Sequence, residues 1–272
     1  MVQSESLAET DVIPHLSTRW IGKPYHYFPS ITSTNDRLKE MVAQGDARQP
    51  PHGTLLLADY QRAGRGRLDR RWESPPGVSL MFSLLLRPDW PAQQLLWLTM
   101  LASLAAVEAA EGQVAVPLGV KWPNDLMLWQ EGTWYKWGGV LLEGSVGQNG
   151  RLQHVVLGMG LNVNLAASQL PEGITPVSSL ALASGELLDR RALLLDLLAR
   201  LETGYGRAEA GQSPQPAWRE RLITLGQAVT VSQPGQPLLT GLAYDVDAWG
   251  QLLVQTEDGQ TEAIAAGDVS LR

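Results

Sequence analysis

A short segment of the chain concentrates positive charge. Five arginines and two glycines fall between positions 62 and 71, namely Arg62, Gly64, Arg65, Gly66, Arg67, Arg70 and Arg71. Guanidinium groups are permanently charged, forked donors that match phosphate and carboxylate oxygens, and glycine permits backbone conformations that other residues avoid. We interpret the segment as a mobile loop that closes over a polyanion, although a run of charges can also be a solvated face.

Three ordered strings indicate a family. Gly64-Arg65-Gly66-Arg67, followed by Arg70 and Trp72, resembles the adenylate-binding loop of biotin–protein ligases. Lys121-Trp122-Pro123-Asn124-Asp125-Leu126 matches the KWPND signature of that family, and Gly158-Met159-Gly160-Leu161-Asn162-Val163 matches its G-x-G-x-N strand end. Order and spacing agree, so together the motifs are a far stronger signal than any one alone. The resemblance covers about residues 25 to 272.

The resemblance implies both a fold and a reaction. The fold is α+β, a mixed sheet with helices on one face as in class II synthetases, followed by a small C-terminal SH3-like β-barrel. The reaction is ATP-dependent: the enzyme makes biotinyl-5′-AMP from biotin and ATP, with Mg²⁺. It then transfers biotin to a lysine of a biotin carboxyl carrier domain, part of a biotin-dependent carboxylase.

Site residues are carried over by resemblance. For biotin they are Ser33, Thr34, Asn35, Gln61, Gly64, Arg65, Gly66, Arg67, Lys136, Gly139 and Leu141. For ATP they are Arg65, Arg67, Arg70, Trp72, Lys121, Asn124 and Asn162, with Arg70 and Trp72 also stabilising the ordered loop. Lys136, Arg67 and Asp125 are the catalytic candidates, and no metal site is expected beyond contacts to Mg-ATP.

The chemistry explains these residue types. A carboxylate and a triphosphate repel each other, so cations must hold them in contact, and one lysine aimed at the reacting oxygens would stabilise the developing charge. Asp125 would orient the acceptor lysine or accept its proton. A neutral urea such as the biotin ring needs donors and acceptors, which the hydroxyls of Ser33 and Thr34 provide.

Each candidate also has a structural interpretation. Ser33 and Thr34 are preferred N-cap residues, and they precede a segment in which Leu38, Met41 and Val42 share one helical face. A lone lysine such as Lys136 is usually exposed. For Trp122-Pro123 we favour a strand bulge that shapes the backbone.

Apolar periodicity predicts the elements that must position these residues. The predicted strands are 53–59, 78–86, 120–128, 140–143 and 155–163. A tryptophan-rich connection at 129–137 could pack its aromatic side chains against a partner, although we favour a hairpin that covers its own strands. The predicted helices follow Asn35 as far as Gly45 and span 95–110, 187–205 and about 218–225. Short strands at 229–231, 239–246, 252–256 and 261–264 outline the barrel. We expect an N-terminal arm at 1–24, a catalytic domain at 25–216 and the SH3-like domain at 224–272.

Composition limits the alternatives. A net charge of -7 and a pI near 5.1 argue against nonspecific nucleic-acid binding, which requires a basic face. The chain has no cysteine, which excludes thiolate nucleophiles and disulfides. It shows no signal peptide and no apolar run of bilayer length, so we expect a cytoplasmic protein without membrane contacts. We also expect a monomer or a weak homodimer. The short arm also disfavours a helix-turn-helix and a repressor role.

Two rival functions remain. A lipoate or octanoate ligase shares the fold class, but the chain carries Gly-Arg-Gly-Arg where lipoate ligases have an R-R-x-x-G-G-G string, and octanoyltransferases use a cysteine. A noncatalytic RNA-binding module would use an RG-type segment. The acidic pI and the absence of aromatic residues between the arginines count against it.

Overall fold

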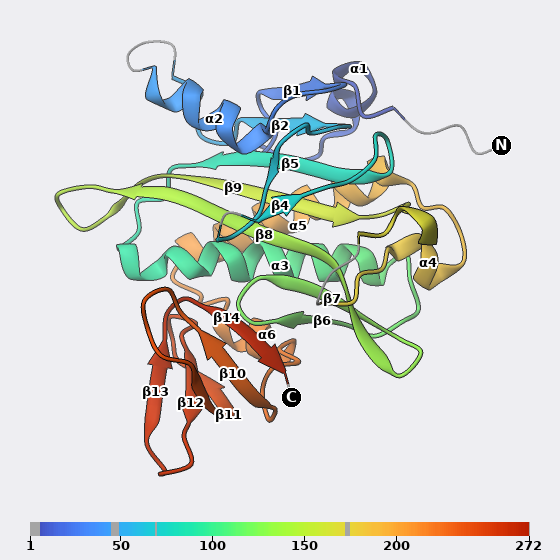
Figure 1. Ribbon diagram of the computed structural model, residues 1–272. Coiled ribbons are helices and arrows are strands. Elements are labelled where there is room, and N and C mark those ends of the chain that lie inside the picture. Colours follow the sequence, from blue (N-terminus) through green and yellow to red (C-terminus); the bar gives the residue numbers. More distant parts are fainter. Residues whose placement is uncertain (1–5, 45–48, 69, 172–174, 272) are drawn as a thin grey trace.

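A seven-stranded mixed sheet organises the larger part of the molecule, in the order β1-β2-β5-β9-β8-β7-β6 (Figure 1). The computed structural model describes residues 6–44, 49–68, 70–171 and 175–271. The strands of the sheet are β1 (Tyr25–Phe28), β2 (Leu55–Ala58), β5 (Ser79–Leu86), β6 (Leu118–Lys121), β7 (Asp125–Gln130), β8 (Thr133–Val146) and β9 (Leu152–Asn162). β1 and β2 pair in parallel, and the other neighbours are antiparallel.

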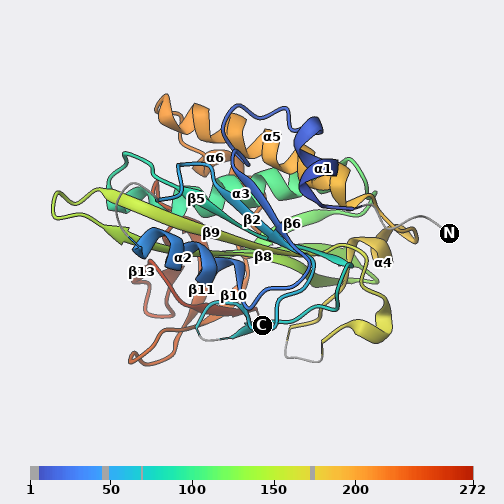
Figure 2. The ribbon, with the colours of Figure 1, turned by 90° about the horizontal axis from the view of Figure 1, so that it is seen from above.

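Both faces of the central strands are apolar because helices cover both. α3 (Leu95–Glu111) and α5 (Arg190–Glu209) lie on one face, whereas α2 (Thr34–Ala43) lies on the other (Figure 2). In β5, Leu84 and Leu86 face the large core, while Leu85 joins Leu38 and Val42 of α2 in a smaller one. The expectation of helices on one face therefore holds for the two long helices but not for α2.

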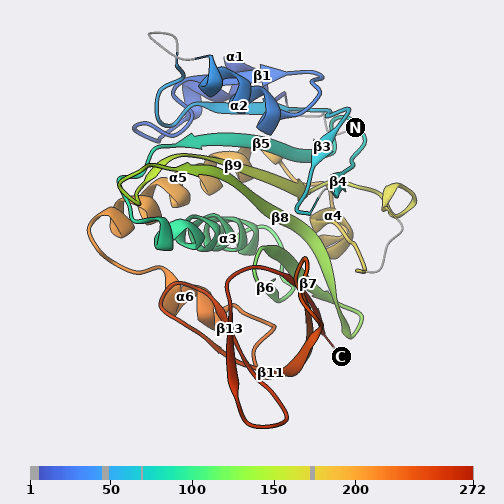
Figure 3. The same cartoon turned by 60° about the vertical axis from the view of Figure 1, so that its left-hand side comes forward.

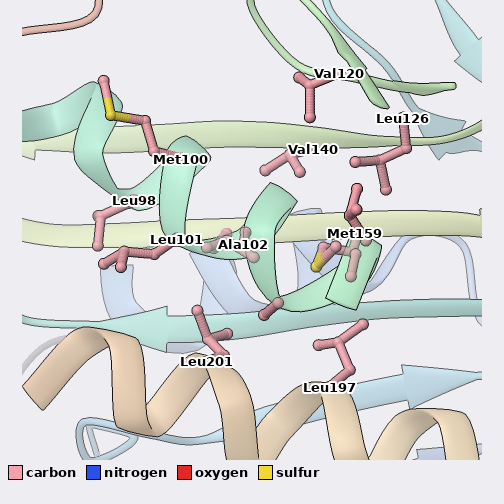
Figure 4. Packing of buried hydrophobic residues seen from close by; sticks show 14 of the residues in the cluster. Leu98, Met100, Leu101, Ala102, Val120, Leu126, Val140, Met159, Leu197 and Leu201 are labelled. Atoms are coloured by element: carbon pink, nitrogen blue, oxygen red, sulfur yellow. The ribbon is translucent and has the colours of Figure 1, made fainter. Parts of the chain in front are cut away.

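The large core fills the space between the sheet, α3 and α5. Leu98, Leu101 and Ala102 of α3 lie between the strands and Leu197 and Leu201 of α5 (Figure 4). α3 is hydrophobic almost all round, and most of its side chains are buried because it is enclosed by the sheet, by α5 and by the C-terminal region. This rigid layer fixes the strand ends that carry the site.

The C-terminal region forms a five-stranded antiparallel sheet, ordered β13-β12-β11-β10-β14, below the larger sheet (Figure 3). Its strands are β10 (Ala228–Ser232), β11 (Leu239–Val246), β12 (Leu252–Gln255), β13 (Thr261–Ile264) and β14 (Asp268–Leu271). It follows the short α6 (Gln215–Glu220). The sequence pattern predicted every one of these strands except β14, which is short and has only one fully buried apolar side chain, Val269.

Tryptophans fasten this region to the larger part of the molecule. The indole N–H of Trp97 donates to the carbonyl of Ala248 at 3.2 Å, and that of Trp122 to the carbonyl of Gly250 at 2.9 Å. The backbone N–H of Trp122 donates to the hydroxyl of Thr224 at 2.9 Å. Trp122 belongs to the KWPND string, so that string is held directly by the C-terminal region.

The N-terminal arm is folded onto the body of the protein. It contains α1 (Glu9–Val12) and the 3-10 turn η1 (Ile13–His15), and Leu7 and Val12 are fully buried. The carboxylate of Glu202 accepts three backbone N–H groups, from Arg19, Trp20 and Ile21, at 2.7 to 3.0 Å. The sequence shows no apolar periodicity in this arm because only isolated apolar residues, such as Leu7 and Val12, are buried.

Two local predictions need correction. Residues 129–137 are not a connection: they belong to a hairpin in which Glu131 and Gly132 form the turn, both at positive φ, and Trp129 pairs with Trp134. The alternative of a tryptophan-rich hairpin is therefore right. Trp122-Pro123 lies in the turn between β6 and β7 and is no bulge; the register irregularity falls between Leu126 and Met127.

The predicted helix after Asn35 is confirmed as α2, but Gly45, its predicted end, lies outside the described residues. Within the part of the chain described above, no helix is both long and apolar enough to cross a bilayer.

Candidate functional site

A cavity of about 420 Å³ opens between the sheet, the start of α2 and β14. Its lining includes most of the residues expected from the sequence: Ser33, Thr34, Asn35, Gln61, Arg65, Gly66, Arg67, Arg70, Trp72, Lys121, Asn124, Asp125, Lys136, Gly139 and Leu141. These residues come from several separate segments. The cavity has two chemically different ends.

The first end, which we call the neutral end, is built around the start of α2. The hydroxyl of Ser33 caps the helix by accepting the N–H of Asp36 at 3.3 Å. The N–H and hydroxyl of Thr34 both donate to the side-chain oxygen of Gln61, at 2.7 and 3.2 Å. Ser33 thus caps the helix, as the structural interpretation predicts, and it also lines the cavity.

Ser83 of β5 supports this end from below. Its fully buried hydroxyl lies 2.7 Å from the hydroxyl of Thr34 and 2.5 Å from the side-chain oxygen of Asn35. Sequence reasoning missed Ser83, whose only signal is a hydroxyl in the middle of an apolar run of β5. The hydroxyls of Thr34 and Ser83 and the side-chain oxygens of Asn35 and Gln61 all have partners within the protein, so these groups are preorganised.

The two glycines of the G-x-G string leave room for the side chains of neighbouring residues. A Cβ on Gly158 would lie 2.3 Å from the side-chain oxygen of Asn35, and one on Gly160 would lie 2.5 Å from the indole of Trp72. The side chains of Asn35 and Trp72 thus lie directly against these glycines. Asn162, predicted to contact ATP, is buried, donates to the carbonyl of Ser178 at 3.2 Å and does not line the cavity.

The second end, which we call the charged end, gathers cations. The described lining includes Arg65, Arg67, Arg70, Arg71, Lys121 and Lys136, against the carboxylates of Asp125 and Asp268. The ammonium of Lys136 lies 2.5 Å from a carboxylate oxygen of Asp125. Burial lowers the pKa of Lys121, an effect that Asp125 opposes and Lys136 reinforces. Such an excess of positive charge favours an anionic ligand.

The arginine segment forms a small hairpin, which we call the arginine hairpin. β3 (Gly64–Arg65) pairs with β4 (Arg71–Trp72), and the N–H of Gly66 donates to the carbonyl of Arg70 at 2.8 Å. A Cβ on Gly64 would lie 2.4 Å from the carbonyl of Trp72, which explains the glycine; Gly64 does not line the cavity.

The C-terminal region holds the arginine hairpin. Arg67 donates to the side-chain oxygen of Asn124 at 2.9 Å and to the carbonyl of Gly267 at 3.1 Å, and Arg70 pairs with Asp268. Burial lowers the pKa of Arg67, and Asp268 and Asp125 oppose that shift. Sequence reasoning missed Asp268 because no local pattern marks a carboxylate so far along the chain from its partner.

Comparison with known proteins identifies the same family as the sequence motifs. The model of the Biotin/lipoate A/B protein ligase family matches residues 27–162, and that of the Biotin protein ligase C terminal domain matches 224–272. The chain is 32% identical over 268 residues to the bifunctional ligase/repressor BirA of Bacillus spizizenii, covering 97% of this chain and 79% of that protein. It is 32% identical over 254 residues to the biotin--[acetyl-CoA-carboxylase] ligase of Mycobacterium tuberculosis, covering 91% and 90%.

Solved structures agree. The biotin protein ligase of Aquifex aeolicus, in complex with biotin and ATP, superposes with a TM-score of 0.74 at 31% identity, covering 90% of this chain and 97% of that one.

Proposed function

Because this chain belongs to the biotin/lipoate A/B protein ligase family, we propose that it is an ATP-dependent biotin–protein ligase. The observation that carries the proposal is a single cavity with a preorganised neutral end and a cationic end. The ligand that fits must be neutral and polar at one end and anionic at the other, as biotin is. The Aquifex aeolicus ligase, to which the chain is similar, was solved with biotin and ATP.

At the neutral end, Thr34, Asn35 and Gln61 would bind the ureido ring. A urea presents one acceptor and two donors, and the hydroxyl and amide groups can complement both kinds. Because Ser83 and Gln61 already fix these groups, little conformational entropy is lost when the ligand binds.

At the charged end, the biotin carboxylate would meet the α-phosphate of ATP. A carboxylate oxygen attacks phosphorus, the bond to pyrophosphate breaks, and biotinyl-5′-AMP forms. Lys136 would stabilise the negative charge that develops on the phosphoryl oxygens, where a fixed cation is most effective, and Arg67 would hold the phosphate of the adenylate once it has formed. The position of Lys136 beside Asp125 supports this role.

In the second step the amine of an acceptor lysine attacks the acyl carbon and AMP leaves. The attacking amine must lose a proton, and Asp125, which lines the cavity, would orient the amine or accept that proton. We propose a biotin carboxyl carrier domain of a carboxylase as the acceptor.

Magnesium would enter with ATP. Among the residues that the structure describes, no three His, Cys, Asp or Glu side chains are grouped to hold a metal ion. The Asp125 and Asp268 carboxylates are already paired with cations. We therefore assign Mg²⁺ to the triphosphate, whose charge it would neutralise.

The test is pyrophosphate exchange together with transfer. With Mg-ATP, biotin should support exchange of pyrophosphate into ATP, and labelled biotin should become covalent on a lysine of a carrier domain. Exchange supported by lipoate and not by biotin would overturn the proposal in favour of a lipoate ligase.

A further inference from the structure

Two stretches of chain that are far apart in the sequence border the charged end. The first stretch runs from β2 to β5 and carries the arginine hairpin with Arg67. The second stretch runs from β9 to α5 and holds the backbone of Lys136, whose N–H donates to the carbonyl of Pro176 at 2.8 Å and whose carbonyl accepts the N–H of Ser178 at 3.0 Å. The relative position of Arg67 and Lys136 therefore depends in part on how the two stretches are fixed to each other.

Arg190, the first residue of α5, joins both ends of the first stretch. Its guanidinium donates to the carboxylate of Asp59, which follows β2, at 2.9 Å, and to the carbonyl of Ser79, which begins β5, at 3.0 Å. The other carboxylate oxygen of Asp59 accepts the hydroxyl of Tyr27 at 2.6 Å. Burial, and then this hydrogen bond, raise the pKa of Tyr27 to about 12, so the hydroxyl remains a donor. Both oxygens of Asp59 are thus fixed, and Arg190 closes the base of the first stretch.

Asn164 closes the second stretch and joins it to the first. Its side-chain oxygen accepts the N–H of Leu188, and its side-chain N–H donates to the carbonyl of Leu188, both at 2.9 Å. Its backbone N–H donates to the carbonyl of Val78 at 2.7 Å. The two stretches are therefore tied together at one place. We call the residues that tie them the common base: Asp59, Ser79, Asn164 and Arg190.

Arg190 lies where helix stability would disfavour it. It is the first residue of α5, at the positive end of the helix dipole, and its side chain is only 4% exposed. A cation is unfavourable at a helix N-terminus, and burying a charge costs free energy that an ion pair often does not recover. The carboxylate of Asp189 already caps α5 by accepting the N–H of Ala192 at 2.8 Å. The start of α5 therefore does not require Arg190, whose contacts with Asp59 and Ser79 point to another role.

The neutral end has anchors of its own. Around Gln61, the N–H of Ile31 donates to the carbonyl of Tyr60 at 3.0 Å, and the carbonyl of Ile31 accepts the N–H of Arg62 at 2.9 Å. The side chain of Gln61 is held by Thr34. A change in the common base should therefore affect the charged end and leave the neutral end nearly as it is.

We propose that Arg190 and Asn164 are positioning residues for adenylation, because the common base fixes the arginine hairpin relative to Lys136. The inference rests on the proposed function. Neither side chain is among the described residues that line the cavity, so both act through Arg67 and Lys136 and not on the ligand. A misplacement of about 1 Å between reacting groups can lower a rate by about 10²-fold, so a small shift of the common base is enough to slow the reaction.

The experiment is single-turnover formation of labelled adenylate at varied biotin and saturating Mg-ATP. We expect Arg190→Met to lower the maximal rate by about 10- to 100-fold, with the biotin concentration for half-maximal rate within about 2-fold of the wild type. Arg190→Lys keeps a cation and should recover part of the rate. Asn164→Ala should show the same pattern to a smaller extent, because it removes no charge.

The amplitude of the single turnover separates positioning from folding, because it counts the sites that are folded. It should equal the wild-type amplitude in each variant. If Arg190→Met does not fold, Asn164→Ala tests the same base from the second stretch. The matched control is Arg200→Met, which removes another arginine of α5, paired with Asp196 and Glu108 outside the described cavity lining. It should keep both the rate and the amplitude.

A wild-type maximal rate in the folded variants would overturn the inference, as would a reduced amplitude with an unchanged rate or a loss confined to biotin affinity. None of these results touches the proposed function as long as the wild type makes biotinyl-5′-AMP. A wild type that forms no adenylate from biotin and ATP would instead refute the proposed function itself.

Discussion

The two ends of the cavity are built in opposite ways. The neutral end comes from the start of α2, from β5 and from the segment that follows β2, and Thr34 joins it by hydrogen bonds to Gln61 and Ser83. The charged end is assembled from the arginine hairpin, the β6–β7 turn, β8 and β14, and its cations outnumber its described carboxylates. The neutral end has hydrogen bonds within the protein even without a ligand, whereas the cations of the charged end repel one another until an anion binds.

This difference indicates a division of labour. Preorganised neutral groups suit recognition, because they bind the ground state and the transition state alike. Clustered cations suit the chemical step, because the negative charge that they stabilise grows as phosphorus is attacked. Variants at the neutral end should therefore change affinity, and variants at the charged end should change rate.

The largest effect is expected for Lys136→Ala. Removing a cation from the reacting oxygens should slow adenylation by roughly 10²-fold or more, since electrostatic contacts of this kind are worth that much. Biotin affinity should stay near the wild-type value, and Lys136→Arg should recover part of the rate. Single-turnover formation of labelled adenylate measures both. Unchanged adenylation would make Lys136 an ordinary surface lysine.

The next effect concerns retention of the intermediate. Arg67→Gly should still form adenylate but release it on the order of 30-fold faster, because a hydrogen bond to a charged group is lost. Biotin-dependent AMP production without an acceptor, and labelling of unrelated proteins, report the leak.

Arg62→Gly is the matched control for that leak. Arg62 belongs to the same segment but donates to Ser30 and Thr32, outside the cavity lining. It should not leak. If Arg67→Gly stops adenylation with no release of the intermediate, Arg67 acts in the chemical step.

A smaller effect is expected at the neutral end. Thr34→Val removes the hydroxyl, which leaves the side-chain oxygen of Gln61 with one donor fewer and the buried hydroxyl of Ser83 with one acceptor fewer, and this should weaken biotin binding by about 10-fold. The rate at saturation should change little, and Thr34→Ser should bind almost as the wild type does. Calorimetric titration with biotin decides, and an unchanged dissociation constant would contradict the assignment of this end.

The smallest effect lies away from both ends. His52 stacks on Trp20 at 4.0 Å, and its Nδ1 accepts the N–H of Arg87 at 2.9 Å. Burial, and then the charge of Arg87, lower the pKa of His52, and the same causes lower that of His154. As the pH falls below about 6.5, these histidines take up protons in the unfolded chain before they do so in the folded protein. Their contribution to the free energy of unfolding is therefore fully present above that pH and is lost below it.

Thermal unfolding between pH 7 and pH 5 measures this decline. His52→Gln, which keeps an acceptor but does not titrate, should have a shallower slope. Biotin affinity, measured at pH 7, should be the same in both proteins. A slope that His52→Gln leaves unaltered would show that other groups set the acid sensitivity.

Local patterns explain how much of this could be read from the sequence. Ser33 and Thr34 predict a helix start, and the alternation in β5 predicts a strand, because a helix cap and a strand pattern both depend on residues that are neighbours in the chain. Asp268 could not be found in this way, since its importance comes from Arg70 across the fold. The sequence shows Gly158 and Gly160 as part of a motif, but only the packed structure identifies Asn35 and Trp72 as the residues that lie against them.

The central claim is that the neutral end binds and the charged end reacts, within one cavity. The most direct test is single-turnover adenylation at varied biotin concentration, with Thr34→Val and Lys136→Ala compared in the same assay. We expect Thr34→Val to raise the biotin concentration for half-maximal rate with little change in the maximum, and Lys136→Ala to lower the maximum with little change in that concentration. Two variants that shift the same quantity to the same extent would contradict the claim.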